Sequence, residues 1–186
     1  MRRRRWAAAA MLAAAIAVGA GANAIDANFI ATGWHTVQDG QEGADSTVGN
    51  FQVHVHGATT SDRLEDSEMM TSPAAFVVVD LSYATTDAWD TPEEVVLIDG
   101  DGREFVEPSG FSSDGRVWAA GPDLWHRGTL LFEVPTGATD DLTLEFRPQR
   151  PQADRPAWLL RVPLTLRPSA EPLVLEEARV LPEGER

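Results

Sequence analysis

Four short apolar runs, separated by glycine, aspartate and proline, constrain the fold of this chain more than any other feature. They lie at 75–83, 95–105, 128–135 and 142–146. Within these runs apolar residues recur at every second position, which is the period of a β-strand whose side chains alternate between two faces. Short strands of this kind, joined by turns, are typical of an antiparallel β-sandwich. The sequence therefore predicts an all-β fold.

Two of the runs also predict where their strands lie in a sheet. Because Phe76–Val79 is apolar on both faces, the strand that contains it is expected at the centre of a sheet. Asp99–Gly102 consists of residues that tolerate positive φ, and its position between apolar stretches predicts a hairpin. On the strand at 142–146, the intervening Glu145 and the following Arg147 are expected to face water.

The remaining elements are predicted from weaker patterns. Alternating residues at 51–56 predict the first secure strand, and the polar stretch 59–72 is interpreted as a long loop. A further alternation at 158–166 predicts another strand, and because Pro163 has no backbone N–H to donate, we expect it to be an edge strand. A last strand is predicted within 173–181.

Three of these elements resemble a known family. The strand Phe76–Asp80, the hairpin Asp101–Phe105 and the strand Phe132–Pro135 are similar to those of an immunoglobulin-like (telokin-like) domain of unknown function. The family occurs in extracytoplasmic bacterial proteins, often lipoproteins, and the match covers about residues 50–147. The resemblance implies an immunoglobulin-like β-sandwich outside the cytoplasm and supplies no catalytic residues. This chain departs from it by having no cysteine for lipid attachment, and by adding strand-like sequence after Phe146.

The amino terminus has the pattern of an export segment. Arg2–Arg5 precede an alanine-rich apolar run, and Ala22–Ala24 forms a small-x-small cleavage site. The uncharged stretch is also about the 20 residues that a spanning helix needs. Residues 1–24 are therefore expected to be a signal peptide or a hydrophobic membrane-anchor helix, with the bulk of the chain outside the membrane. We expect an exported protein, held at the cell membrane or secreted after cleavage, with a connector at 25–49 and the immunoglobulin-like sandwich at 50–182.

Charge excludes several classes of function. Residues 25–186 keep 11 of the 15 arginines and all 29 acidic residues, so they carry a formal charge of −18. Such a domain is repelled by phosphate backbones, which excludes nucleic acid as a partner. The chain has no lysine, which excludes a lysine nucleophile or a phosphate-binding lysine of the P-loop type. We expect no enzyme activity and no cofactor.

His54 and His56 are candidate metal ligands. They lie two residues apart on one predicted strand, so both imidazoles point to the same face. That spacing suits zinc or copper if another side chain completes the shell. The alternative is an ordinary solvent-facing strand surface. The carboxylates of Asp99, Asp101 and Glu104 are interpreted as part of a hairpin turn and not as a calcium site, because their spacing departs from the EF-hand loop.

Aromatic residues outside the strand pattern are candidate partner-binding residues. They are Trp89, Phe111, Trp118 and Trp125. Tryptophan is enriched at binding hot spots, and loops at one end of a sandwich are a common binding surface. The alternative is that these side chains cap the ends of the core. Pairing of a partner with the strand at 158–166 is a further route.

Three functions remain open at this point. The first is a non-catalytic binding or accessory module of the cell envelope with a protein partner, tethered to the membrane by its amino-terminal segment if that segment is not cleaved. The alternative is a metal-binding envelope protein that uses His54 and His56. The third is a hydrolase without a recognised motif, since Ser112 and its neighbours lie in no Gly-x-Ser-x-Gly elbow.

Overall fold

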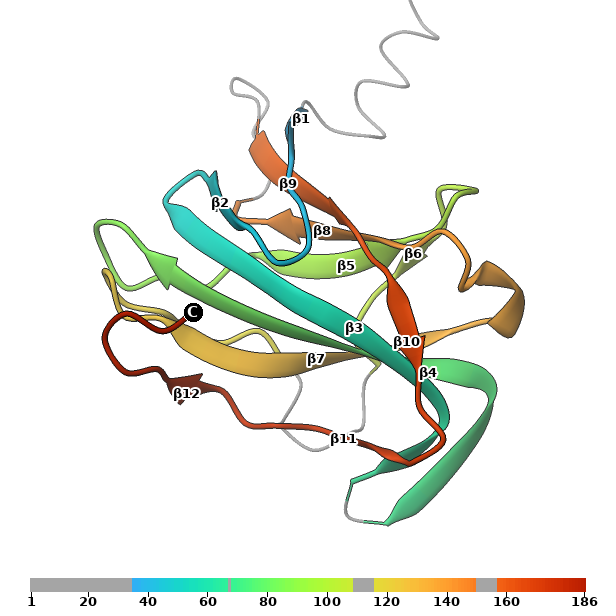
Figure 1. Ribbon diagram of the computed structural model, residues 1–186. Coiled ribbons are helices and arrows are strands. Elements are labelled where there is room, and N and C mark those ends of the chain that lie inside the picture. Colours follow the sequence, from blue (N-terminus) through green and yellow to red (C-terminus); the bar gives the residue numbers. More distant parts are fainter. Residues whose placement is uncertain (1–34, 67, 109–115, 150–156) are drawn as a thin grey trace, which may run out of the picture. The chain divides into compact units, whose positions relative to one another are not determined.

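The computed structural model describes residues 35–66, 68–108, 116–149 and 157–186 (Figure 1). The chain divides into two compact units, one of residues 36–150 and 158–186 and one of residues 1–35 and 151–157. In the second unit only His35 and Ala157 are described, so the account that follows concerns the first. Among the described residues, no helix has the length and apolarity to cross a membrane. The segment 1–24, predicted to be a signal peptide or anchor helix, lies outside them.

The described residues form two β-sheets, which confirms the prediction of an all-β fold. One sheet has the strand order β1 (His35–Asp39), β9 (Ala157–Pro163), β8 (Thr143–Arg147), β5 (Glu94–Ile98) and β6 (Glu104–Phe105). The other has the order β10 (Leu166–Pro168), β3 (Phe51–Glu65), β4 (Met69–Thr85), β7 (His126–Val134) and β12 (Arg179–Val180), while β2 (Asp45–Val48) and β11 (Leu173–Val174) also pair with β3. Most pairings are antiparallel, but β10 and β11 run parallel to β3.

The apolar face of β4 joins the two sheets into one core. Val77, Val79, Leu81 and Tyr83 belong to a buried cluster that also contains Leu144 and other residues of the first sheet. Figure 1 shows β5, β8 and β9 stacked over β3, β4 and β7. Fully burying an aliphatic side chain of this kind contributes roughly 1.5–3 kcal/mol. The alternation seen in the sequence is therefore the pattern that holds the sandwich together.

The opposite face of β4 packs into a second cluster. Phe76 and Val78 lie there with Leu64, Leu131 and Leu173. β4 is flanked by β3 on one side and β7 on the other. Both observations confirm that this strand is central and apolar on both faces at its start. The hairpin predicted at Asp99–Gly102 is also confirmed, because it joins β5 to the antiparallel β6.

The stretch 59–72 is not the long loop that we expected. β3 continues to Glu65 and β4 begins at Met69, so the two strands form one long hairpin. Leu64 pairs with Met70 across this hairpin and is fully buried in the second cluster. The polar composition misled the prediction because most other side chains described in the stretch are exposed or half-buried, while the backbone of both strands stays paired.

Two further predictions of exposure are wrong. β9 is not an edge strand, because it lies between β1 and β8, and Pro163 is its last residue. Glu145 does not face water: it is 1% exposed and accepts hydrogen bonds from Arg147 and Arg161. Arg147 in turn donates hydrogen bonds to Glu94 and Glu104, so opposite charges on neighbouring strands are paired.

The strands near both ends of the described chain also differ from the prediction. Residues 25–49 were expected to be a connector, but their described part contributes β1 to one sheet and β2 to the other. The last predicted strand, at 173–181, is two short strands, β11 and β12, on different neighbours. In both regions short strands are set by pairing with β3, β7 or β9 and not by a long apolar run.

The chain crosses between the sheets twice at one corner. β1 leads into β2 through the loop at 40–44, and β9 leads into β10 through Leu164 and Thr165. Both new strands join the same edge of β3: β2 pairs with residues 51–54 and β10 with residues 58–60. The gap between them contains a bulge in β3, where the register shifts between Val55 and Gly57.

Candidate functional site

Trp89 presents a large exposed aromatic surface between β4 and β5. Its side chain is 61% exposed. The indole packs over Gly121. A Cβ added to this glycine would lie only 2.7 Å from Cε2 of Trp89, so the indole occupies the space that a larger residue would need. The indole also meets the His126 ring edge to face, with the ring centroids 5.7 Å apart. Gly121 and His126 therefore contact one part of the indole, and the rest of it is exposed to solvent.

The surroundings of Trp89 are apolar and acidic. The segments near residues 85–90 and 120–124 pair through isolated bridges, which bring Leu124, 45% exposed, to the same region. Asp90 accepts a hydrogen bond from Asn50 at 3.0 Å, and Asp123 accepts one from Gln52 at 3.4 Å. An electron-rich aromatic face beside carboxylates favours a cationic group. We call Trp89, Asp90, Asp123 and Leu124 the tryptophan surface.

The other predicted partner-binding aromatics lie elsewhere. Trp118 stacks on the buried Tyr83, with ring centroids 4.7 Å apart, and its backbone N–H donates to the Tyr83 hydroxyl at 2.8 Å. Trp125 is only 6% exposed, with the Arg186 guanidinium 4.4 Å from its ring centroid. Trp118 packs against the core and Trp125 is buried, so both offer little surface to a partner. Phe111 lies outside the residues that the structure describes.

His54 and His56 do lie side by side on β3. Their ring centroids are 4.5 Å apart. One nitrogen of each ring is already engaged: Nδ1 of His54 bonds Asp45 at 2.7 Å, and Nε2 of His56 bonds Ser82 at 2.6 Å. Within the described parts of the chain, no group of three or more His, Asp or Glu side chains is arranged to hold a metal ion. The metal site stays a prediction that a zinc titration of the full-length protein would test.

The carboxylates of the Asp99–Gly102 hairpin have structural partners. Asp99 accepts hydrogen bonds from the backbone N–H groups of Asp101 and Arg103 and from Nε of Arg103, at 3.0, 2.9 and 2.6 Å. Glu104 bonds Arg147. These contacts fix a turn and a charge network, in agreement with the interpretation of the hairpin as structural. Ser112 and the serines near it lie outside the described residues.

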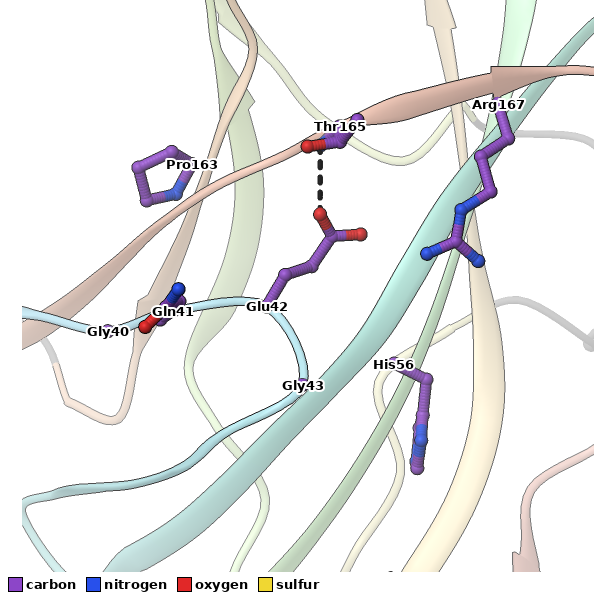
Figure 2. A pocket seen from close by; sticks show the side chains of 8 residues that line it. All are labelled: Gly40, Gln41, Glu42, Gly43, His56, Pro163, Thr165 and Arg167. Atoms are coloured by element: carbon purple, nitrogen blue, oxygen red, sulfur yellow. Dashed lines mark hydrogen bonds between the residues drawn. The ribbon is translucent and has the colours of Figure 1, made fainter.

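A polar pocket opens where the two crossings meet the bulge of β3. It has a volume of about 600 Å³ and is lined by Gly40, Gln41, Glu42, Gly43, His56, Pro163, Thr165 and Arg167 (Figure 2). The loop at 40–44 is fixed at both ends. The N–H of Gly40 donates to the Arg161 carbonyl at 2.7 Å, and the N–H of Gly43 donates to the Val55 carbonyl at 2.8 Å. We call this space the corner pocket.

Glu42, His56 and Arg167 give the corner pocket its charge pattern. Oε2 of Glu42 accepts a hydrogen bond from the Thr165 N–H at 3.0 Å, which ties the two crossings together. Burial lowers the pKa of His56, which favours its uncharged imidazole. Arg167 forms no ion pair with the described residues. One negative and one positive side chain therefore line the pocket, and their charges cancel.

Sequence reasoning missed Glu42, Thr165 and Arg167. Glu42 belonged to an expected connector, and Arg167 followed an expected edge strand, so nothing local placed them together. Only His56 was singled out, for a metal site. The Gly57 that follows it was a usable signal, because an isolated glycine inside a strand pattern often marks a bulge.

Comparisons with known proteins do not assign a function. No protein-family model matches the sequence, and no curated protein matches it. Among solved structures, the chain is similar to an uncharacterized beta-sandwich protein from Clostridium difficile 630, with 12% identity and a TM-score of 0.42. That match covers 68% of this chain and 96% of the other. The two-sheet fold described here rests on the strand pairing of this chain itself.

Proposed function

We propose that this protein is a non-catalytic, extracytoplasmic binding module that holds a protein partner of the cell envelope at its tryptophan surface. The observation that carries the proposal is the indole of Trp89, 61% exposed yet packed against Gly121 and His126. A rigid exposed tryptophan buries a large area on binding at little entropic cost, which is why such residues dominate many interfaces.

Charge indicates what kind of partner surface fits. Asp90 follows Trp89 in the chain, Asp123 lies two residues after Gly121, on which the indole packs, and residues 25–186 carry −18. A partner segment that presents an arginine or lysine would place its cation over the indole and beside these carboxylates. Long-range attraction would also speed its association at low salt. The proposed partner is therefore a protein with an exposed basic segment.

Location and family enter as parts of the same proposal. Export is supported by Arg2–Arg5 and the apolar run that follows them. Membership of the immunoglobulin-like (telokin-like) family is supported by the order of three elements: the central β4, the Asp-Gly hairpin after β5, and β7. An accessory role in the envelope agrees with a domain that presents a tryptophan 61% exposed at its surface.

The test uses photo-cross-linking from defined positions in the producing cell. A photoreactive phenylalanine analogue at position 89 should give a discrete protein adduct, and the same analogue at position 158 should not. Trp158 is the matched control, because it is a tryptophan 49% exposed on β9. The adduct partner, once purified, should carry an exposed basic segment and bind the parent protein directly.

Affinity then decides whether Trp89 is a hot spot. Trp89→Ala should weaken binding of that partner at least tenfold, whereas Trp158→Ala should leave it unchanged. Raising the salt concentration should slow association, because the attraction is between exposed charges. Equal affinity of the parent and the Trp89→Ala variant for the cross-linked protein would overturn the proposal.

A further inference from the structure

Glu42 presents an acceptor inside the corner pocket that no described residue satisfies. Its Oε2 is fixed by the Thr165 N–H at 3.0 Å, so the carboxylate cannot turn freely. Its Oε1 is buried and accepts no hydrogen bond from the described part of the chain. Buried polar atoms are almost always hydrogen-bonded in proteins. This oxygen is therefore positioned to accept a hydrogen bond from something that enters the pocket.

Arg167 supplies the complementary donor. Its guanidinium forms neither an ion pair nor a hydrogen bond with the residues that the structure describes. Figure 2 shows Glu42 and Arg167 reaching from the two crossing segments toward the same space.

Glu42 and Arg167 approach each other beside Gly57 without forming an ion pair. A Cβ at this position would lie 3.1 Å from Oε1 of Glu42 and 3.2 Å from Nη1 of Arg167. Gly57 also has φ +154°, a conformation that favours glycine. The charged atoms thus flank one small volume without pairing with each other. A ligand that occupies that volume must donate to one side and accept from the other.

We propose that the corner pocket binds the zwitterionic head of a free α-amino acid, with its ammonium on Glu42 and its carboxylate on Arg167. The ammonium and the carboxylate of an α-amino acid are attached to one carbon, so together they span the short distance between these side chains. Both contacts would be charge-assisted hydrogen bonds, which are stronger than the neutral bonds that a sugar hydroxyl would form. Arginine also matches the two oxygens of a carboxylate.

The rest of the pocket agrees with a small, neutral-overall ligand. The charges of one carboxylate and one guanidinium cancel, and burial lowers the pKa of His56, which favours its uncharged form. A volume of about 600 Å³ lies within the range of about 300–1,000 Å³ that is common for small-molecule sites. Gln41 and Thr165 at the wall are polar, so a short or polar amino-acid side chain fits best. This site is independent of the tryptophan surface.

The first experiment compares three small molecules on the full-length protein. L-alanine carries both charges, N-acetyl-L-alanine lacks the ammonium, and L-alaninamide lacks the carboxylate. Isothermal titration calorimetry should show saturable binding of L-alanine, with each analogue at least tenfold weaker. Equal binding of either analogue, or no saturable binding of L-alanine, would overturn the proposal. Binding of glucose in place of L-alanine would also overturn it, by showing a site for hydroxyl groups.

The second experiment tests the two side chains. Arg167→Gln and Glu42→Gln should each weaken L-alanine binding at least tenfold, and both variants keep hydrogen-bonding groups of similar size. Arg179→Gln is the matched control, because Arg179 lies exposed on β12. Melting temperatures show whether each variant is folded. Unchanged L-alanine affinity in a folded Arg167→Gln variant would contradict the assignment. Trp89→Ala should leave L-alanine affinity unchanged, which separates this proposal from that of the protein partner.

Discussion

At the scale of single residues, burial in this sandwich changes the pKa of the Glu107 carboxyl group. The side chain lies near the buried Tyr83, and its Oε1 is buried without a hydrogen bond from the described residues. Burial raises the pKa of Glu107 to about 7, although Arg116 opposes the shift. A carboxyl group with so high a pKa is protonated in the folded protein under mildly acidic conditions, where an unfolded chain has already lost the proton.

Glu107→Gln should therefore change the pH dependence of stability. Below about pH 4.5 the carboxyl is protonated in both states, and the variant should melt near the parent. As pH rises from there toward 7, the carboxyl ionises in the unfolded parent while it stays protonated in the folded parent. Ionisation stabilises the unfolded state, so the free energy of unfolding of the parent falls. The variant cannot ionise, and its melting temperature should exceed that of the parent by an increasing margin that levels off above pH 7. Thermal melts at pH 4 and pH 8 measure this margin. An equal margin at both values would contradict the raised pKa.

Residue environments were the part of the structure that the sequence predicted least. Glu145 alternates correctly with buried Leu144 and Phe146, yet it is itself buried because Arg147 and Arg161 cover it. Arg161 comes from the neighbouring β9, and no local pattern shows which strands will be neighbours. The same limit applies to Glu42, whose partner Thr165 lies far along the chain. Alternation shows which side of a strand a residue takes, but not what covers that side.

At the scale of elements, the far end of the β3–β4 hairpin is held by the second cluster. Leu64 is fully buried there, opposite Met70. Leu64→Ala should lower the free energy of unfolding by about 2–5 kcal/mol, the usual range for a buried leucine truncated to alanine. Met69→Ala, which removes a side chain that is 55% exposed on the same hairpin, is the control and should change it little. Urea denaturation measures both variants. A loss below about 0.5 kcal/mol for Leu64→Ala would show that this stretch behaves as the loop first expected.

Elements with strong alternation were predicted well, and elements defined by pairing were not. β4, β7 and β8 follow from apolar residues at every second position, and the β5–β6 hairpin follows from its Asp-Gly turn. β1, β2 and β10 are short and polar, and they exist because they complete the edges of longer strands. Their two crossings create the corner pocket. The candidate ligand site therefore lies in the part of the fold that local patterns did not reveal.

At the scale of the whole molecule, charge and chain order connect the binding proposals to export. The acidic residues all follow the apolar segment, and the arginine cluster precedes it. This asymmetry favours retention of the cluster in the cytoplasm and transfer of the rest. A domain with a charge of −18 is repelled by anionic lipid head groups, so its binding surfaces would remain available to proteins and small solutes.

Export is tested by fractionating the producing cell and measuring intact masses. We expect either a chain that begins near Ile25 in the soluble envelope fraction or a full-length chain in the membrane fraction. The first result means a released module whose partner is to be sought among secreted or wall proteins, and the second means a tethered module. Replacing Arg2–Arg5 with glutamate should hold the chain back, because it reverses the charge asymmetry that orients the segment. Substituting Arg179 with glutamate leaves that asymmetry intact and serves as the control. Full-length parent protein in the cytosol would contradict export, and with it the proposal of an envelope partner, while leaving the amino-acid site in the corner pocket to its own test.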